Sequence, residues 1–508
     1  MIRHLTLKDV GPARDLKFAF SPRLNVLTGD NGLGKTFVLD VLWWVLTTTW
    51  AGEKAFPWRP LPKDFVGEAV GGAAEPEPEP DPGILAVLTK REGEPWDDME
   101  VVTSGTWKWD SQEWVRSLWQ PNRLTPGSVV YPEQHDEAEF RPRSLVIYAR
   151  IDGSYAVFDT LYAKGGISTF ADTAIVLSPT ELWDGKEVAD AEVQGGKRTV
   201  IAGLLADWVS WQQRSKSKEF GALRKVLHAL WPPGEHLNLD LEPTRVHLRD
   251  RRDIPAVGTP YGVVPVTLAS AGMKRALSLA YLLVWAWTEH EKAAKESRQK
   301  PTRDVVLLID EPELHQHPSW QRAFLPAVLK AIGMIAPNAA VQVFTATHSP
   351  LVLASLENAW VEALDDLFVM ERDGSLVRAN EQEFVREGDV TAWLASSVFG
   401  GVSGRSRGAE LAIDAAQNFM ADRLKEADDS LGLLYDHLDE QPRPAIPDNE
   451  DLDWLMQIAD EAYRRRPLAE RVHDALKHTL PGHDEFWVHW TLVYRPGTRP
   501  KEGGDAAR

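Results

Sequence analysis

The stretch that decides the fold is RDVVLLIDEPELHQHP, residues 303–318. Val305 to Ile309 form a short, wholly apolar run, which predicts a strand buried on both faces, as in a parallel sheet. The run ends in two adjacent acids, Asp310 and Glu311. Because an unpaired buried carboxylate is strongly disfavoured, two acids at this place indicate a task that needs them. Binding a magnesium ion and an attacking water is such a task; a solvated acidic turn is the alternative.

A second motif lies near the N-terminus, where the apolar run 24–27 leads into GDNGLGKT and a helical apolar run, 37–48, follows. The motif has the spacing G-x-x-x-x-G-K-T of a phosphate-binding loop. Its glycines turn backbone N–H groups toward phosphates, its lysine reaches the β- and γ-phosphates, and its threonine hydroxyl binds Mg²⁺. A chance glycine-rich turn is the alternative. The predicted nucleotide ligands are Gly29, Asp30, Asn31, Gly32, Leu33, Gly34, Lys35 and Thr36.

Two further motifs flank the acidic strand in the sequence. Ser270 and Gly272 directly precede a long apolar helical run, where serine is a good N-cap and glycine leaves backbone N–H groups open to an anion. His348 follows the buried run 340–345 and therefore lies at the carboxyl end of a predicted strand, where α/β sheets bind ligands. An ordinary capped helix and a structural histidine are the alternatives for each motif alone. The order of the four motifs favours one shared site.

Composition excludes several classes of protein. The 508 residues allow one large domain with insertions or two to three domains. The absence of cysteine excludes disulfides, thiolate zinc sites and iron–sulfur clusters. A net charge of −19 disfavours a general polyanion binder but allows a local basic patch. The sequence shows neither a signal peptide nor an apolar run near the roughly 20 residues of a membrane span, so we expect a cytoplasmic protein without a membrane partner.

The four motifs GDNGLGKT, ASAGMKR, VVLLIDEPELHQHP and VFTATHSP together resemble the nucleotide-binding head of ABC-type ATPases of the RecF, SMC and OLD branch. They are most similar to those of OLD-like and AAA_21 proteins, and the ATPase subunits of the two-component anti-phage systems Septu and PARIS share this plan. The resemblance covers residues 1–48 and 262–380. It implies an α/β fold: a P-loop ABC-ATPase head with a mixed sheet and helices, an inserted α+β region and a helical C-terminal region.

The resemblance also implies the cofactors, ATP and Mg²⁺, and the catalytic residues Lys35, Glu311 and His348. Asp310 would orient the hydrated Mg²⁺ together with Thr36, so these two are the metal residues. Glu311 would position or deprotonate the attacking water, and His348 would be the switch histidine near the γ-phosphate.

A dimer follows from the signature motif of the same family. Ser270 and Gly272 would contact the γ-phosphate of ATP held by a second protomer, and Leu314 and His315 would lie in the loop that crosses the seam. The resemblance therefore implies a homodimer with ATP at its interface, with higher oligomers left open. The glutamine of the family's Q-loop is not placed by the sequence; Gln134 and Gln194 are weak candidates.

We expect an ATP-hydrolysing enzyme that acts as a sensor or regulator on double-stranded DNA or of a separately encoded nuclease effector, in phage defence. A RecF-like DNA repair or replication ATPase is the alternative; an ABC transporter subunit and a non-hydrolysing scaffold are weaker ones. No nuclease site is predicted within the chain, because the acids after residue 430 lie among predicted helices and Pro-rich turns. The trigger, the partner and the place of DNA contacts are not set by the sequence.

The expected organisation has five parts. The first part of the ATPase head is followed by an insertion that contains a Pro/Glu-rich loop, 69–83, and a tryptophan-rich stretch, 107–119. That stretch is read as a small core of its own rather than a base-stacking surface, because few Lys or Arg accompany it. The parts are 1–48 (head), 49–198 (insertion), 199–267 (connection), 268–380 (head) and 381–508 (helical region).

Overall fold

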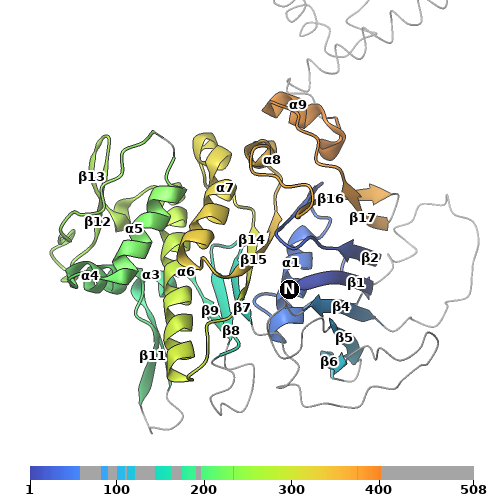
Figure 1. Ribbon diagram of the computed structural model, residues 1–508, viewed down its shortest axis with the longest axis horizontal. Coiled ribbons are helices and arrows are strands. Elements are labelled where there is room, and N and C mark those ends of the chain that lie inside the picture. The colour runs from blue at the N-terminus through green and yellow to red at the C-terminus, as the bar shows by residue number, and fades with distance from the viewer. Residues whose placement is uncertain are drawn as a thin grey trace, which may run out of the picture. The chain divides into compact units, whose positions relative to one another are not determined.

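The computed structural model describes residues 1–57, 82–89, 100–108, 111–119, 144–161, 174–189, 196–232, 234–373 and 376–401. The chain divides into two units, Met1–Gly400 and Gly401–Arg508, and the described structure belongs almost wholly to the first. Within this first unit, helices and two sheets form successive layers (Figure 1). The mixed α/β fold predicted from the sequence is confirmed.

The larger sheet has eight strands in the order β17-β16-β3-β15-β14-β7-β8-β9. The strands from β16 to β7 run parallel to one another, and β17, β8 and β9 are antiparallel additions at the two edges. The predicted acidic strand is β14, and all its residues are buried. The bounds are β3 (Leu24–Gly29), β7 (Ser144–Ala149), β8 (Tyr155–Asp159), β9 (Ala174–Leu177), β14 (Asp304–Asp310), β15 (Ala340–Ala346), β16 (Asp365–Asp373) and β17 (Leu376–Gln382).

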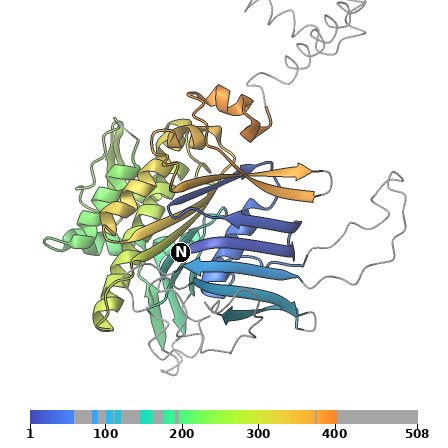
Figure 2. The same cartoon turned by 45° about the vertical axis from the view of Figure 1, so that its right-hand side comes forward.

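The smaller sheet is antiparallel, in the order β2-β1-β4-β5-β6, and Figure 2 shows it in blue. Its strands are β1 (Ile2–Val10), β2 (Ala13–Ala19), β4 (Gly83–Thr89), β5 (Glu100–Lys108) and β6 (Glu113–Trp119). The helix after the phosphate loop, α1 (Lys35–Thr47), shares one hydrophobic core with both sheets. Val306 and Leu308 of β14 face this core, whereas Val305, Leu307 and Ile309 face the core on the opposite side.

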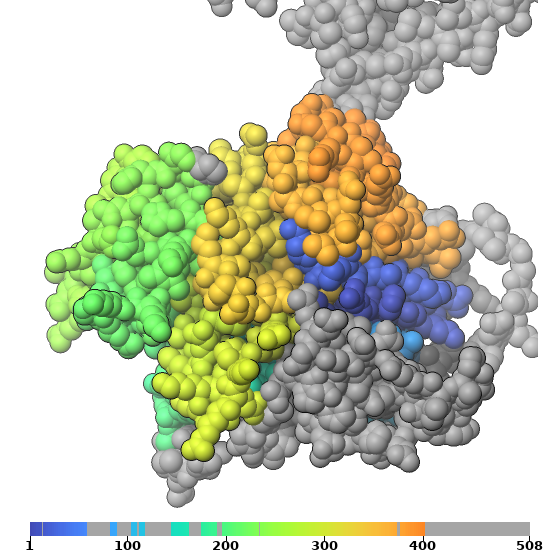
Figure 3. All heavy atoms as spheres, in the orientation of Figure 1, coloured from blue at the N-terminus to red at the C-terminus, as the bar shows by residue number. Residues whose placement is uncertain are grey.

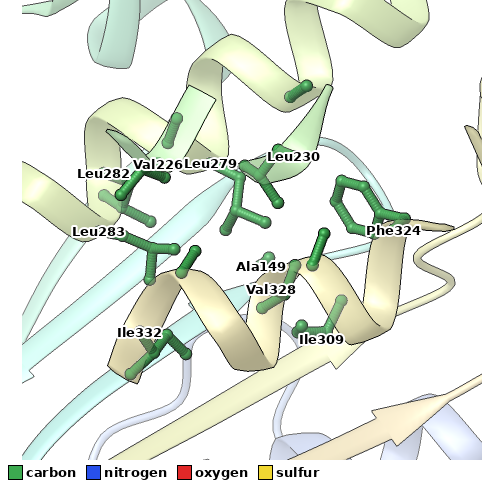
Figure 4. Close-up of a cluster of buried hydrophobic side chains, with 14 of the residues drawn as sticks. Ala149, Val226, Leu230, Leu279, Leu282, Leu283, Ile309, Phe324, Val328 and Ile332 are labelled. Carbon is green, nitrogen blue, oxygen red and sulfur yellow. The ribbon is translucent and has the colours of Figure 1, made fainter. Parts of the chain in front are cut away.

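The opposite face of the larger sheet is covered by helices. Figure 4 shows Val226, Leu279 and Val328, from three helices, gathered over Ile309 and Ala149. None of the described helices is both long and apolar enough to cross a membrane. The remaining described α-helices are α3 (Pro179–Asp184), α4 (Leu204–Gln213), α5 (Lys218–Leu230), α6 (Ala271–Glu296), α7 (Pro318–Ile335), α8 (Pro350–Leu356) and α9 (Val390–Ala395). Two antiparallel strand pairs lie outside the large sheets: β10 (Lys186–Ala189) with β11 (Lys197–Ile201), and β12 (Ala256–Thr259) with β13 (Gly262–Pro265).

The region 49–198, expected to be an insertion, contributes strands to both sheets. β7 pairs directly with the acidic strand β14, and β4 pairs with β1. The strand-like runs at 84–89 and 145–148 were recognisable in the sequence, but pairing between strands so far apart depends on tertiary contacts that periodicity does not reveal. The strands of this region therefore lie in the same two sheets as β1 and β14.

The tryptophan-rich stretch packs on the head as well. The rings of Trp107 and Trp114 lie 5.4 Å apart, and Trp114 lies 6.3 Å from Trp44 of α1. The indole N–H of Trp114 also donates to the Ala55 carbonyl at 2.9 Å. This stretch thus extends an existing core instead of closing one of its own. The tract 69–81 and the predicted helices beyond residue 401 lie outside the described residues.

Candidate functional site

The phosphate loop joins β3 to α1, as the sequence predicts. Gly29, Gly32 and Gly34 have φ angles of +117°, +78° and +93°, in the region that favours glycine. A Cβ on Gly29 would lie 2.0 Å from the carbonyl oxygen of Met370, so no other residue fits there. Asp30 is exposed, as are the two residues that follow it, while Leu33 beneath them is buried. The loop therefore presents its backbone to solvent at the N-terminus of a helix, an arrangement suited to phosphates.

Lys35 is buried beneath this loop. Its Nζ donates to the carbonyl oxygens of Gly29 at 3.0 Å and Asp30 at 2.6 Å. Burial lowers the pKa of Lys35 to about 8, although the negative charges of Glu311 and Asp30 act in the opposite direction. A phosphate at the loop would supply the counter-charge that favours the ammonium form.

Asp310, the last residue of β14, has the properties of a metal ligand. Its side chain is nearly inaccessible to solvent, and neither carboxylate oxygen has a hydrogen-bond partner within the described structure. Burial raises its pKa to about 7; the neighbouring Thr36 hydroxyl opposes this rise, and the charges of Glu311 and Asp40 add to it. Buried, unpaired carboxylate oxygens beside a threonine hydroxyl match the oxygen ligands that Mg²⁺ prefers, so these residues fit the ion.

Glu311 and His348 lie together beyond the strand ends. The Nε2 of His348 is 3.8 Å from a carboxylate oxygen of Glu311. Burial and the charge of Lys35 lower the pKa of His348, which favours the neutral form of its ring. Glu311 has a φ of +44°, which is uncommon for a residue with a side chain and places backbone strain at this position.

Glu313, the second glutamate of the DEPE sequence, holds the histidine loop in place. One of its carboxylate oxygens accepts hydrogen bonds from the Thr347 hydroxyl and the His348 backbone N–H, both at 2.8 Å. Burial raises the pKa of Glu313. Its place in the DEPE motif is the one signal in the sequence that points to this residue.

Arg275 is a second residue whose contacts at the site were not predicted from the sequence. It lies in α6, and its Nη2 donates to the backbone carbonyl oxygens of Asp310 and Glu311, both at 2.9 Å. The helix that carries the signature motif thus touches the backbone of the acidic strand end.

The signature residues lie on the surface at the start of α6. Ser270 caps the helix, and its hydroxyl accepts from the backbone N–H of Met273 at 3.3 Å. A Cβ on Gly272 would lie 3.1 Å from the carbonyl oxygen of His315, so glycine permits close packing of the helix start on that loop. Ser270 and His315 are both exposed.

The structure brings most of the predicted residues to one edge of the larger sheet. Electrostatic contacts connect Lys35 with Asp310, Glu311 and His348, and Thr36 lies beside Asp310. No hydrogen bond among the described residues joins Ser270 or Gly272 to the phosphate loop. The two glutamines considered for the Q-loop, Gln134 and Gln194, lie outside the described residues.

Asp40, in α1, is a further acidic residue near the site. The hydroxyl of Tyr148, on β7, donates to the carboxylate of Asp40 in α1 at 3.1 Å. Burial raises the pKa of Asp40 to about 6, against the effect of this hydrogen bond.

Comparison with known proteins finds similarity in separate segments. Residues 4–57 match a family described as "AAA domain", and residues 261–353 match one described as "AAA ATPase domain". The DNA repair protein RecN of two Xylella fastidiosa strains, Temecula1 and 9a5c, is 40% identical over 42 residues. That match covers 8% of this chain and 8% of the length of each RecN.

Two solved structures of the recombination mediator protein RecF, described as RecF-ATP and RecF-ATPrS, also show weak structural similarity. Each is 13% identical and covers 75% of this chain and 97% or 98% of RecF, with TM-scores of 0.31 and 0.33. The two family matches are the informative ones, because between them they contain the phosphate loop, the signature, the acidic strand end and the histidine. Over the two segments that build this site, the chain is similar to AAA-type ATPase domains.

Proposed function

We propose that this protein binds MgATP at the described edge of the larger sheet and hydrolyses it to ADP and phosphate. The observation that carries the proposal is the convergence of a buried lysine, an unpaired buried carboxylate, a second carboxylate and a neutral histidine beside a phosphate loop. Phosphoryl transfer needs positioning and charge neutralisation more than covalent help, and this set supplies both.

Each residue has a distinct task in this proposal. Lys35 would exchange its loop carbonyl partners for phosphate oxygens, and Thr36 and Asp310 would hold Mg²⁺, whose charge would offset that of the phosphates. Glu311 positions the attacking water and accepts its proton. His348, close to Glu311 and kept neutral, offers an N–H to the γ-phosphate, and Glu313 fixes the loop that carries it.

The proposal includes a homodimer with ATP at its interface. It is supported by the position of Ser270, which is exposed and has no hydrogen bond to the phosphate loop of its own chain among the described residues. Ser270 and Gly272 would complete the site of a second copy. ATP would then bind the closed dimer preferentially and act as a dimerisation switch.

DNA is the partner that we propose for the ATPase, and a basic groove supports it. The groove has a volume of about 520 Å³ and is lined by residues of α5 and α7, which adjoin on the face shown in Figure 3 in green and yellow. Its ionisable lining residues are all basic: Arg224, Lys225, His228 and Lys330. Within the described structure only Arg224 has an ion pair, with Asp240 at 3.1 Å. A groove lined by exposed cations on long side chains is better suited to bind the phosphate backbone of a duplex than to enclose a small anion.

A labelled 30-base-pair duplex tests this groove by fluorescence anisotropy. K225E/K330E should weaken binding by about tenfold or more and flatten its salt dependence, because two phosphate contacts are lost. The matched control is K295E, which reverses the charge of an exposed lysine in the last turn of α6, a helix that does not line the groove. Equal loss in the control, or equally tight binding of poly-glutamate, contradicts a DNA site in the groove.

The proposal extends to a separately encoded nuclease effector and a role in phage defence. Support comes from the resemblance of the four motifs to ATPase subunits of two-component anti-phage systems. A RecF-like role in DNA repair is the alternative, favoured by the names of the matched relatives, a DNA repair protein and a recombination mediator. Co-purification of the product of the neighbouring gene, followed by a plasmid-cleavage assay with ATP, separates the two.

The first test of the whole proposal is steady-state ATP hydrolysis at several protein concentrations, with and without duplex DNA. We expect turnover per chain to rise with protein concentration, because the site needs two copies. Stimulation by DNA supports a DNA-sensing ATPase. Absence of hydrolysis under all conditions contradicts the proposed function.

A further inference from the structure

Arg275 connects the signature helix α6 to the acidic end of β14. It lies five positions after Ser270 in α6, so it belongs to the helix whose exposed start would meet the second copy. Its Nη2 reaches the carbonyl oxygens of Asp310 and Glu311 of its own chain, both at 2.9 Å. A single guanidinium therefore joins the signature helix to the backbone of Asp310 and Glu311.

The backbone held by Arg275 is strained and so depends on such contacts. Glu311 adopts a φ of +44°, and His315, four residues later, adopts +62°. Conformations of this kind persist only where neighbouring groups fix them from several sides. The Glu311 N–H donates to Ala346 at 2.9 Å, and its carbonyl accepts from Leu314 at 3.1 Å as well as from Arg275.

A second contact joins the same helix to the same loop. The backbone of Gly272 packs so closely on the carbonyl of His315 that an added Cβ would lie only 3.1 Å from it. A shift of the start of α6 would consequently act on this loop through Gly272 and on the carbonyl of Glu311 through Arg275. Both contacts would transmit the shift to the position of the Glu311 carboxylate.

We propose that Arg275 is a positioning residue that couples the signature end of α6 to Glu311 of its own protomer. This inference rests on the proposed function. When Ser270 and Gly272 dock on the ATP held by the second copy, Arg275 sets the carboxylate that acts on the ATP of its own chain. Binding of the nucleotide held by the second copy thereby controls hydrolysis of the nucleotide held by the first.

The first test separates positioning from binding. R275M should lower kcat by about ten- to a hundredfold while KM and the affinity for a fluorescent ATP analogue change less than about twofold. R275K should recover part of kcat, since it restores one charged donor. A matched control is K274M, one residue away on α6. If R275M lowers ATP affinity and thermal stability as much as it lowers kcat, Arg275 is a general structural brace and the inference fails.

The decisive test asks which site Arg275 serves, using dimers purified with two different tags. In one dimer R275M and E311Q are on the same chain, opposite a wild-type chain; in the other they are on opposite chains. If Arg275 acts within its own chain, the first dimer keeps one intact site and about half of wild-type activity, and the second has a defect in both sites. The reverse order assigns Arg275 to the partner's site, and equal activities remove its coupling role; either contradicts the inference. Failure of the proposed function is distinct, because the wild-type dimer itself would then be inactive.

Discussion

The acidic end of β14 and the start of α6 contact each other but are built in opposite ways. Asp310 is 1% exposed, and its two carboxylate oxygens have no partner among the described residues. Ser270 is exposed, yet its hydroxyl already caps its own helix. The buried, unsatisfied group indicates a ligand bound within the chain, whereas the exposed, satisfied group indicates a surface for another molecule.

The largest effect is expected on the buried side, at Glu311. E311Q keeps the size of the side chain but cannot accept the proton of the attacking water, so kcat should fall by about 10²- to 10⁴-fold. ATP binding should persist, and an ATP-bound dimer should accumulate, measured by light scattering after gel filtration. K35A is the control, because it should lose nucleotide binding as well. Unchanged turnover in E311Q would remove Glu311 from the mechanism.

A large effect of a different kind is expected on the exposed side. S270R adds a bulky cation at an exposed position, so the chain should fold and bind ATP while hydrolysis falls about 10²-fold, because the altered signature no longer completes the partner's site. Mixing S270R with E311Q should restore activity, because one of the two sites in the mixed dimer then has an intact signature and an intact glutamate. Failure of the mixture to exceed its separate components contradicts a site shared between chains.

A smaller effect is expected at Glu313, which supports the buried side without touching substrate. E313Q keeps one acceptor oxygen for Thr347 and His348 but loses the charge, so kcat should fall about tenfold with KM unchanged. E313A removes both hydrogen bonds and should cost more. Equal kcat in E313A and the wild type would show that the histidine loop holds its position without this carboxylate.

The smallest effect concerns stability rather than turnover. The folded-state pKa of Asp40, about 6, lies above its ordinary value of 3.8, so its ionisation opposes folding increasingly as pH rises through this range. D40N keeps an acceptor for Tyr148 and removes the charge, and should add up to about 3 kcal/mol to the free energy of unfolding above pH 7 and almost nothing near pH 4. Denaturant unfolding of both chains at the two pH values measures this, and a gain that is the same at both contradicts the assignment.

The contrast also explains how far the sequence could be interpreted. Lys35 with Thr36, and Asp310 with Glu311, are neighbours in the chain, so local motifs were sufficient to predict where they lie. Glu313 and Arg275 act on residues more than thirty positions away, through contacts that exist only once β14 lies beside β15 and α6 crosses the strand end. No local pattern contains that information.

The same distinction applies to the fold. The phosphate-loop strand, the acidic strand and the long helix at 271–296 were predictable, because each has its own periodicity and end signals. The membership of β7 in the larger sheet and of β4 in the smaller one was not, since a strand's partner is chosen by packing across the whole head. The strands within 49–198 were therefore expected to form a separate insertion, because their partners could not be identified from the sequence.

The strand order has a consequence for the synthesis of the protein. β3, which carries the phosphate loop, pairs with β15 on one side and β16 on the other, and both begin more than three hundred residues later. The backbone N–H of Ile2 likewise donates to the side chain of Gln342. In a nascent chain β3 therefore lacks both neighbouring strands through most of translation, and pairing between strands so far apart in sequence is intrinsically slow. The phosphate loop reaches its folded surroundings only after β16 has emerged, because Gly29 packs directly against Met370 of that strand.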